Sequence, residues 1–387
     1  MPFVVPDRIV EPLYCIVPVF NPFRWKSRWK HTERAIKHFM DAGAVVYLVE
    51  AAFGRREFAF ADSGLDGLSA NCGMLGQDHR FRHKYIGLRT RDELWLKEAL
   101  INIGVSQLPY DWAQVCWIDS DVQFLRPNWV GECIHKLQHY AFLQMFSHAR
   151  DLGPNYEMLP EDYPHADGPG FVHAWRRGTL NEPVKKLHCP ECNCKIECVC
   201  SGGRCVCTCE PDPSSPYDPY GPYPYAARVW PGLAWAATRP AWEAVGGLMD
   251  FAVWGGADYH QSLCLIGETE KMMRDDLHRN YKTMVLEWYR RCSRHIRQNV
   301  GVMEGSVVHN WHGRKTSRGY VAKHTLLAKI GFDPLHHLKR DYQGLWQLHD
   351  DGSEAFIQLR DTMRRIALER DEDSSDIRIN VGREQGH

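Results

Sequence analysis

The sequence lacks several features that would point to a particular class of protein. No apolar run approaches the roughly 20 residues that a membrane-spanning helix needs. The first ten residues show no basic stretch followed by an apolar one, as a secretory signal would. The formal net charge of −1 argues against a basic arm for non-specific nucleic-acid binding, and no internal repeat is present. We therefore expect a globular, cytoplasmic protein without a membrane span.

Cysteine is scarce outside one short segment. Six of the 14 cysteines are scattered, several in apolar stretches where a free thiol behaves as a small buried hydrophobe. The other eight lie within 21 residues: Cys189, Cys192, Cys194, Cys198, Cys200, Cys205, Cys207 and Cys209. In a cytoplasmic protein this density favours zinc, whereas in an oxidising compartment it would give disulfides. We expect structural Zn²⁺ that holds together an insertion too short for its own core.

The hydrophobic pattern predicts an α/β fold. Leu13 to Phe20 and Val45 to Glu50 are typical of buried strands, and Trp29 to Ala42 between them has helical periodicity. This spacing indicates a βαβ unit and a mixed, mostly parallel sheet flanked by helices. Arg56 to Ala61 alternates, and we expect a third strand there that could be antiparallel. Ligands of such sheets bind beyond the carboxyl ends of the strands. The candidate nucleotide-binding residues at this edge are Pro18, Phe20, Asn21 and Glu50.

The chain is expected to consist of one α/β domain with two additions. Residues 1–186 and 226–330 form the domain, with a nucleotide-binding half followed by an acceptor half. Residues 187–225 contain the cysteine cluster and a Pro/Tyr-rich return segment that cannot be a helix or a central strand. Residues 331–387 are predicted to form a charged helical extension with a frayed polar tail.

A predicted buried strand, Val115 to Ile118, ends in the motif Asp119-Ser120-Asp121. Because the chain turns there, both carboxylates can reach one divalent ion. Hard oxygen ligands of this kind suit Mn²⁺ or Mg²⁺, with phosphate oxygens in the remaining positions. Taken alone, two aspartates at this spacing are more often part of a solvated turn. Other motifs in the chain are therefore needed to identify this one as a metal site.

Four stretches in this order resemble the metal-dependent nucleotide-sugar glycosyltransferases of the GT-A fold. The β-1,4-galactosyltransferases and the polypeptide N-acetylgalactosaminyltransferases are the most similar families. The stretches are a helix with Lys97 and Asn102, the motif Asp119-Ser120-Asp121, the loop Trp254-Gly255-Gly256-Ala257-Asp258-Tyr259, and the segment His309-Asn310-Trp311-His312-Gly313-Arg314-Lys315. The resemblance spans residues 13 to 325 apart from the cysteine-rich insertion.

The resemblance implies a site for a nucleotide-sugar donor, which we expect to be UDP-linked. Lys97 and Asn102 would contact the donor, although Lys97 could also be an ordinary exposed helix lysine. Asp121 would bind the metal directly, and Asp119 would position the ribose or a metal-bound water.

A histidine late in the chain completes the metal site in these families, and neutral imidazole is a suitable Mn²⁺ ligand. His312 is the first candidate and His309 the second. The basic residues after them, Arg314 and Lys315, would neutralise the diphosphate, with help from Arg318.

Asp258 matches the general base of the inverting galactosyltransferases, where it would take the proton from the acceptor hydroxyl. The same residue could instead be a helix N-cap, or serve as both. Ala257 stands where the families have Glu, so the acceptor stays open among a glycan, a protein and a modified DNA base. The acceptor-binding candidates are Trp254, Gly255, Gly256 and Tyr259.

Two other classes of protein match parts of the pattern. One is a non-catalytic module that binds a nucleotide or nucleic acid, with the zinc insertion making the contact. The other is a metal-dependent hydrolase or nucleotidyltransferase, but a nucleotidyltransferase normally has a Gly-rich phosphate loop where this chain has Val-Phe-Asn-Pro. The preferred hypothesis is an enzyme that transfers a sugar to an acceptor hydroxyl with inversion.

Overall fold

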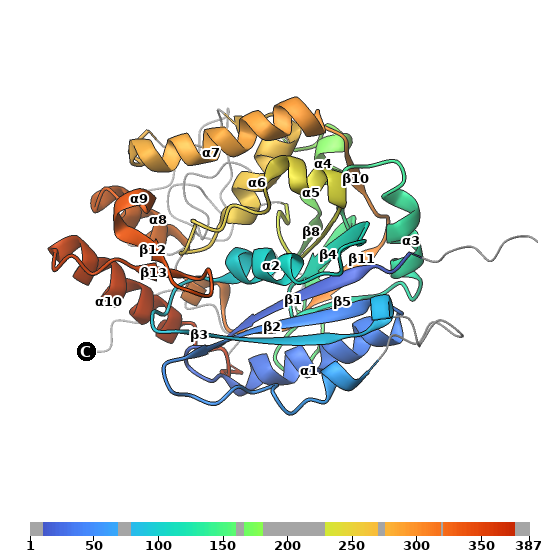
Figure 1. Ribbon diagram of the computed structural model, residues 1–387, viewed down its shortest axis with the longest axis horizontal. Helices are drawn as coiled ribbons and strands as arrows, with labels where there is room; N and C mark the ends of the chain where they lie inside the picture. Colours follow the sequence, from blue (N-terminus) through green and yellow to red (C-terminus); the bar gives the residue numbers. More distant parts are fainter. Residues whose placement is uncertain are drawn as a thin grey trace, which may run out of the picture.

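A seven-stranded sheet forms the centre of the protein in the computed structural model, which describes residues 11–68, 79–159, 166–180, 229–269, 275–318 and 320–375 (Figure 1). Its strands are β1 (Tyr14–Phe20), β2 (Val45–Phe53), β3 (Lys84–Thr90), β4 (Gln114–Ile118), β6 (Phe142–Gln144), β9 (Ala234–Thr238) and β10 (Val300–Val302). Their order is β10-β6-β9-β4-β1-β2-β3, and β9 runs antiparallel to both of its neighbours. The other pairings are parallel, which confirms the expected mixed, mostly parallel sheet.

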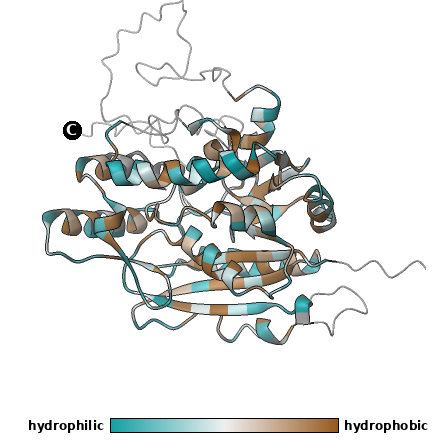
Figure 2. Ribbon diagram, turned by 45° about the horizontal axis from the view of Figure 1, so that its top comes forward, coloured by the Kyte–Doolittle hydropathy of each residue, from teal (hydrophilic) through white to brown (hydrophobic). Residues whose placement is uncertain are grey.

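Helices cover both faces of this sheet. Helices α1 (Lys26–Asp41) and α3 (Trp129–Lys136) pack on one face, with α2 (Lys97–Ser106), α5 (Arg239–Val245), α6 (Ala257–Ile266) and α7 (Arg279–Arg291) on the other. Alternate residues of β1 enter two separate hydrophobic cores, Ile16 on one face and Val17 on the other. Because both faces are covered, β1 and β2 are buried at every residue, and Figure 2 shows much of the sheet in the brown of hydrophobic residues.

A second, four-stranded sheet lies beside the first. Its strands are β5 (Val122–Phe124), β11 (Ser306–His309), β7 (His148–Asp151) and β8 (Asp167–Pro169), in that order. Strand β11 runs antiparallel to β5 and parallel to β7. The register pairs His309 with Val122 on one side and with Asp151 on the other. Residues from three distant parts of the sequence therefore meet at the end of β11.

The remaining described elements surround these sheets. They are α4 (Phe171–Arg176), α8 (Tyr320–Lys329), α9 (Pro334–His337), α10 (Glu354–Glu369), the hairpin β12 (Leu338–Arg340) with β13 (Trp346–Leu348), 3₁₀ turns at Leu65–Gly67, His79–Phe81 and Lys315–Arg318, and a π-helical turn at Cys292–Ile296. The hairpin is tied to the α5–α6 connection, because Arg340 and Trp346 both donate hydrogen bonds to Asp250.

The structure confirms most of the elements expected from the sequence but corrects the third strand. Arg56 to Ala61 is a loop, and the third strand is β3, which runs parallel to β2. The physical reason is Glu50, whose carboxylate accepts hydrogen bonds from the backbone N–H groups of Ala59 (2.7 Å) and Phe60 (3.1 Å). A side chain thus satisfies the backbone donors that a neighbouring strand would otherwise have to satisfy.

Five cysteines of the described residues are buried free thiols, as expected for the scattered ones: Cys15, Cys116, Cys133, Cys264 and Cys292. The cysteine-rich segment 189–209, its insertion 187–225 and the tail from residue 376 lie outside the described residues. Within the described ranges, none of the helices has both the length and the apolar composition to cross a bilayer.

Helix α2 packs closely on the sheet through Gly104, and this contact predicts a stability change. A Cβ on Gly104 would lie 2.7 Å from Ile16 Cγ2 and 2.9 Å from Val49 Cγ2. We expect Gly104→Ala to lower the free energy of unfolding by about 1–3 kcal/mol, because overpacking outweighs the higher helix propensity of alanine. Urea-induced unfolding measures the change.

Gly131→Ala in helix α3 is the matched control. There the Cβ would meet the end of the exposed Asn128 side chain, which can move. We expect this variant to be as stable as the wild type or more so. Equal effects of the two substitutions would contradict close packing at Gly104.

Candidate active site

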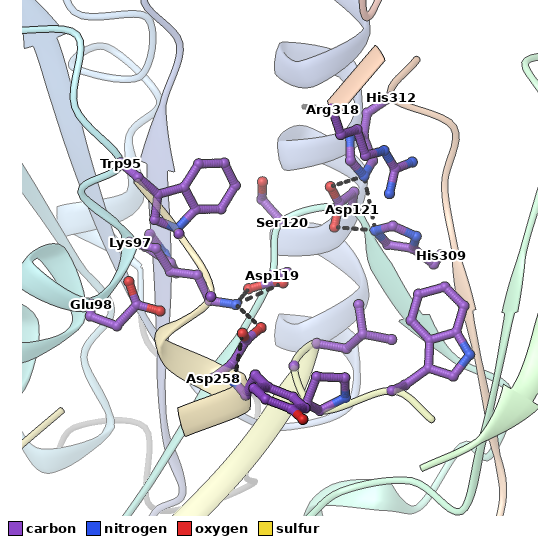
Figure 3. Close-up of a pocket in the computed structure, with 18 of the residues that line it drawn as sticks. Trp95, Lys97, Glu98, Asp119, Ser120, Asp121, Asp258, His309, His312 and Arg318 are labelled. Atoms are coloured by element: carbon purple, nitrogen blue, oxygen red, sulfur yellow. Dashed lines mark hydrogen bonds and ion pairs between the residues drawn. The ribbon is translucent and has the colours of Figure 1, made fainter. Parts of the chain in front are cut away.

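The carboxyl ends of β1 and β4 open into a cavity that gathers many of the expected site residues. Thirteen of them line it: Pro18, Phe20, Lys97, Asp119, Asp121, Trp254, Gly255, Gly256, Asp258, Tyr259, His309, His312 and Arg318. Figure 3 shows them in two groups, one around Asp121 and the two histidines, the other around Lys97, Asp119 and Asp258. The cavity therefore has two chemically different ends.

At one end, Asp121, His309 and His312 form a compact buried group. One ligand atom from each lies within 4.8 Å of the others. The distances to the Asp121 carboxylate are 3.4 Å from His309 Nε2 and 3.7 Å from His312 Nε2, and the two Nε2 atoms lie 3.1 Å apart. The chain turns between β4 and β5 to present Asp121, whose carbonyl accepts a hydrogen bond from Asn310 N–H (2.7 Å). Both histidine candidates are thus at the same place.

Asp151 at the end of β7 orients His309. The distance between His309 Nδ1 and Asp151 Oδ1 is 2.6 Å, and Asp151 is buried. A carboxylate that accepts the Nδ1 proton leaves Nε2 directed at Asp121, which is how metal-binding histidines are commonly held. Burial lowers the pKa of His309, but the charges of Asp121 and Asp151 outweigh burial and raise it to about 9.

The residues at this end suit a divalent cation. Asp121 Oδ1 is buried and, among the described residues, its nearest cationic partner is His309 Nε2 at 3.4 Å, with no hydrogen bond formed, so a ligand could bind this oxygen. Burial and the nearby cations Arg318 and Arg370 lower the pKa of His312, which keeps this imidazole neutral, as a metal ligand must be. His309, whose pKa is raised, would have to release a proton when a metal binds. Two imidazole nitrogens and one carboxylate, with phosphate oxygens added, form a donor set that Mn²⁺ accepts.

At the other end, Lys97 joins two carboxylates. Its Nζ lies 2.7 Å from Asp119 Oδ1 and 3.9 Å from Asp258 Oδ2. Burial lowers the pKa of Lys97, but the charges of Asp119 and Asp258 outweigh it and raise the pKa. Lys97 is therefore a buried, charged residue of the site. Asp119 pairs with this lysine and is not part of the Asp121 group.

Asp258 lies in the first turn of α6, after a loop that two glycines make possible. Gly255 and Gly256 have φ of +95° and +87°, a region that side chains rarely adopt. Gly256 is the N-cap residue of the helix, so the N-cap alternative for Asp258 is wrong. Its Oδ1 accepts a hydrogen bond from Tyr259 N–H (2.9 Å). The side chain is 32% exposed, which leaves it accessible from the cavity.

Glu98 is a buried carboxyl of this end that the sequence did not reveal. It follows Lys97 on α2 and lines the cavity. Burial raises the pKa of Glu98 to about 8; the charge of Lys97 opposes this rise, and that of Asp258 adds to it. The carboxyl is therefore largely neutral at pH 7.

The structure does not bring three of the expected donor-binding residues to the cavity. Asn21 exchanges hydrogen bonds with the backbone of Trp25, and Glu50 holds the loop described above. Asn102 binds the backbone of Leu248 through both its Oδ1 and its Nδ2. These polar side chains stabilise loops around the site.

The basic residues differ from those expected after His312. Arg314 is not among the residues that line the cavity, and the side chain of Lys315 lies outside the described part. Arg318, the third basic residue expected after the histidines, does line the cavity. Three cations that the sequence did not suggest line it as well: Arg28, Lys323 and Arg370. Trp95, which meets Phe20 edge-on at 5.0 Å between ring centroids, was also missed.

Two solved structures of sugar-transferring proteins are distantly similar to the chain. A variant of β-1,4-galactosyltransferase 7 from Drosophila, bound to manganese, UDP-Gal and xylobiose, is 10% identical, with a TM-score of 0.25 over 65% of this chain and 60% of that one. A nucleotide-diphospho-sugar transferase from Desulfovibrio desulfuricans G20 is 12% identical, with a TM-score of 0.24 over 37% of this chain and 59% of that one. The chain thus spans less than two thirds of the length of either.

No protein-family model and no curated protein sequence matches the chain. Because the structural matches are this distant, they carry no argument about function. The function has to be argued from the residues of the cavity.

The role given to Asp151 predicts weaker metal binding when its charge is removed. We expect Asp151→Asn to lower the affinity for Mn²⁺ by about 10–100-fold, because the oriented, electron-rich imidazole of His309 is lost. Titration of Mn²⁺ followed by its electron paramagnetic resonance signal measures this. Asp167→Asn, an exposed carboxylate on neighbouring β8, is the control and should bind Mn²⁺ normally. Equal affinities in all three proteins would refute the role of Asp151.

The raised pKa of Glu98 predicts a pH-dependent difference in stability. The folded state binds this proton more tightly than the unfolded state, so the stabilisation is complete below pH 4.5 and is lost as the pH rises to about 8. We expect Glu98→Gln to gain about 2–4 kcal/mol of unfolding free energy relative to the wild type between pH 4.5 and pH 9. Denaturant unfolding across this range provides the test. Glu33→Gln, an exposed site on α1, should show no such trend.

Proposed function

We propose that the protein is a metal-dependent glycosyltransferase, which moves a sugar from a UDP-linked donor to an acceptor hydroxyl with inversion. One observation carries the proposal: a single cavity holds the Asp121–His309–His312 group at a cation-rich end and the Asp258 carboxylate at the other. A departing diphosphate requires the metal and the cations of the first end, and an attacking hydroxyl requires the carboxylate of the second.

The cation-rich end suits the diphosphate. Arg318 and Lys323 line the cavity together with two further arginines. Burial, with the charges of Arg370 and Arg318, lowers the pKa of Lys323 to about 7, a sign that positive charge is crowded at this end. A bound diphosphate would relieve that crowding. A divalent ion held by Asp121, His309 and His312 would stabilise the negative charge that develops on the leaving group.

Asp258 suits the role of general base. In the proposed step, the acceptor hydroxyl gives its proton to the Asp258 carboxylate while its oxygen bonds to the anomeric carbon. The bond from that carbon to the diphosphate breaks, and its electron pair stays on the phosphate oxygen. The products are a glycoside of inverted configuration and the nucleoside diphosphate. Lys97, whose Nζ lies 3.9 Å from Asp258 Oδ2, places a positive charge beside this carboxylate.

Asp258 and the metal candidates have different contacts, which favours sugar transfer over metal-dependent hydrolysis. Asp258 pairs with Lys97, whereas Asp121 pairs with the two histidines. In a hydrolase with a metal-bound nucleophile, the base would be expected beside the metal ligands. The lining of the cavity also includes the rings of Trp95, Trp254 and Tyr259.

Two substitutions test the proposal by separating the two ends. Nucleotide sugars are first screened by thermal shift with and without Mn²⁺, since a ligand of the folded state raises the melting temperature. With the donor found, transfer is assayed on glycans, proteins and modified DNA. We expect Asp258→Asn to lower kcat by about 10²–10⁴-fold while donor binding stays within a few fold. Asp121→Ala should abolish the effect of Mn²⁺ on donor binding.

Asp62→Asn, an exposed carboxylate far along the chain from both motifs, is the control and should behave as the wild type. Donor binding without transfer or donor hydrolysis would favour a binding module instead. Full activity of Asp258→Asn would exclude this residue as the base.

A further inference from the structure

The residues that follow helix α10 return to the cavity from the far end of the sequence. The Asp373 carboxylate accepts hydrogen bonds from the backbone N–H groups of Lys26 (2.9 Å) and Ser27 (2.7 Å) at the start of α1. On the other side, Trp311 Nε1 donates to the carbonyl of Ser374 (2.6 Å). The segment Arg370 to Ser374 is thus fixed between α1 and the loop that carries His312.

Within this segment, Glu372 bridges two arginines. Its Oε1 lies 2.6 Å from Arg28 Nη2 and 2.7 Å from Arg370 Nε, and its Oε2 lies 2.8 Å from Arg28 Nε. Glu372 and Arg370 are 2% and 6% exposed. One buried carboxylate therefore aligns two guanidinium groups that both line the cavity.

Arg370 also contacts the metal candidates directly. Its Nη2 lies 2.9 Å from His312 Nδ1, which accepts the hydrogen bond. An imidazole that binds a metal through Nε2 keeps its proton on Nδ1, so that nitrogen is then no longer an acceptor. The guanidinium of Arg370 would need another acceptor beside the metal. Phosphate oxygens supply one, and the planar fork of arginine suits them.

We propose that Arg28 and Arg370, aligned by Glu372, form a clamp for a diphosphate, and that the segment after α10 is an integral part of the donor site. The inference rests on the proposed function, because the diphosphate is taken as the leaving group of the donor. It goes further in assigning the clamp to two residues 342 positions apart, one of them outside the expected α/β domain. Glu372 is a positioning residue, since it acts through the arginines.

Inorganic pyrophosphate tests the clamp without any nucleotide or sugar. Binding to the full chain at saturating Mn²⁺ is measured by calorimetry, and Mn²⁺ binding alone by electron paramagnetic resonance. We expect Arg370→Gln to weaken pyrophosphate binding by about 10–100-fold. Mn²⁺ binding alone should stay the same or strengthen, because a positive charge next to His312 has been removed.

Three further variants guard against a purely structural explanation. Arg370→Lys keeps the charge but not the planar fork, so its pyrophosphate affinity should lie between those of the wild type and Arg370→Gln. If Arg370→Gln does not fold, Arg370→Lys replaces it as the test of the clamp. Glu372→Gln should weaken pyrophosphate binding, but less than Arg370→Gln. Arg364→Gln, on the exposed side of α10 and paired with Glu93, is the matched control and should bind normally.

Two outcomes would overturn the clamp: unchanged pyrophosphate affinity in Arg370→Gln, or a parallel loss of Mn²⁺ and pyrophosphate binding, which would indicate a structural role only. These outcomes are independent of the proposed function. Arg370-dependent pyrophosphate binding in a protein that transfers no sugar would support the clamp and reject the transferase. Sugar transfer with normal pyrophosphate binding in Arg370→Gln would support the transferase and reject the clamp.

Discussion

The pairing of β11 with two neighbouring strands is the constraint on which the site depends. Strand β11 lies between β5 and β7, and the register sets His309 opposite Val122 and Asp151. Because side chains alternate across a strand, a slip of one residue would turn His309 to the other face. The hydrogen bonds between these strands thus bring together Asp121, which precedes Val122, with His309 and Asp151, although the three residues are far apart in the sequence. The sheet works as the scaffold of the Asp121 end of the cavity.

Burial of charge is the second theme of the structure. Lys97 with Asp119, His309 with Asp151, and Glu372 with its two arginines are all ionisable groups removed from water and held by partners. Such pairs cost desolvation energy that their attraction only partly offsets, so they are weak evidence for a stabilising role. Their concentration around one cavity is better explained by a function that needs preorganised charge.

The sequence was sufficient where the signal was local. Strand β1, helix α1 and strand β2 follow from apolar periodicity, and Asp121, His309 and His312 stand in short motifs that the fold brings together. It was insufficient where partners are distant. The sequence around Asp151 does not indicate that this residue pairs with His309. The sequence around Arg370 is typical of the charged end of a helix and does not indicate a binding site. The alternation at Arg56 to Ala61 predicts a strand, because alternation cannot show that Glu50 binds the backbone there.

The tie between α1 and the segment after α10 also bears on how the protein folds. Ser27 and Asp373 are separated by 346 residues, so their hydrogen bonds close a loop that includes nearly the whole domain. The entropy of closing a loop grows only slowly with its length, so the tie costs little more than a shorter one at equilibrium. The rate of folding is affected more strongly, because contacts between residues distant in sequence form late. During synthesis, the residues after α10 also leave the ribosome after those of the central sheet. A growing chain can therefore complete the central sheet well before the wall that Arg370 and Glu372 contribute is in place.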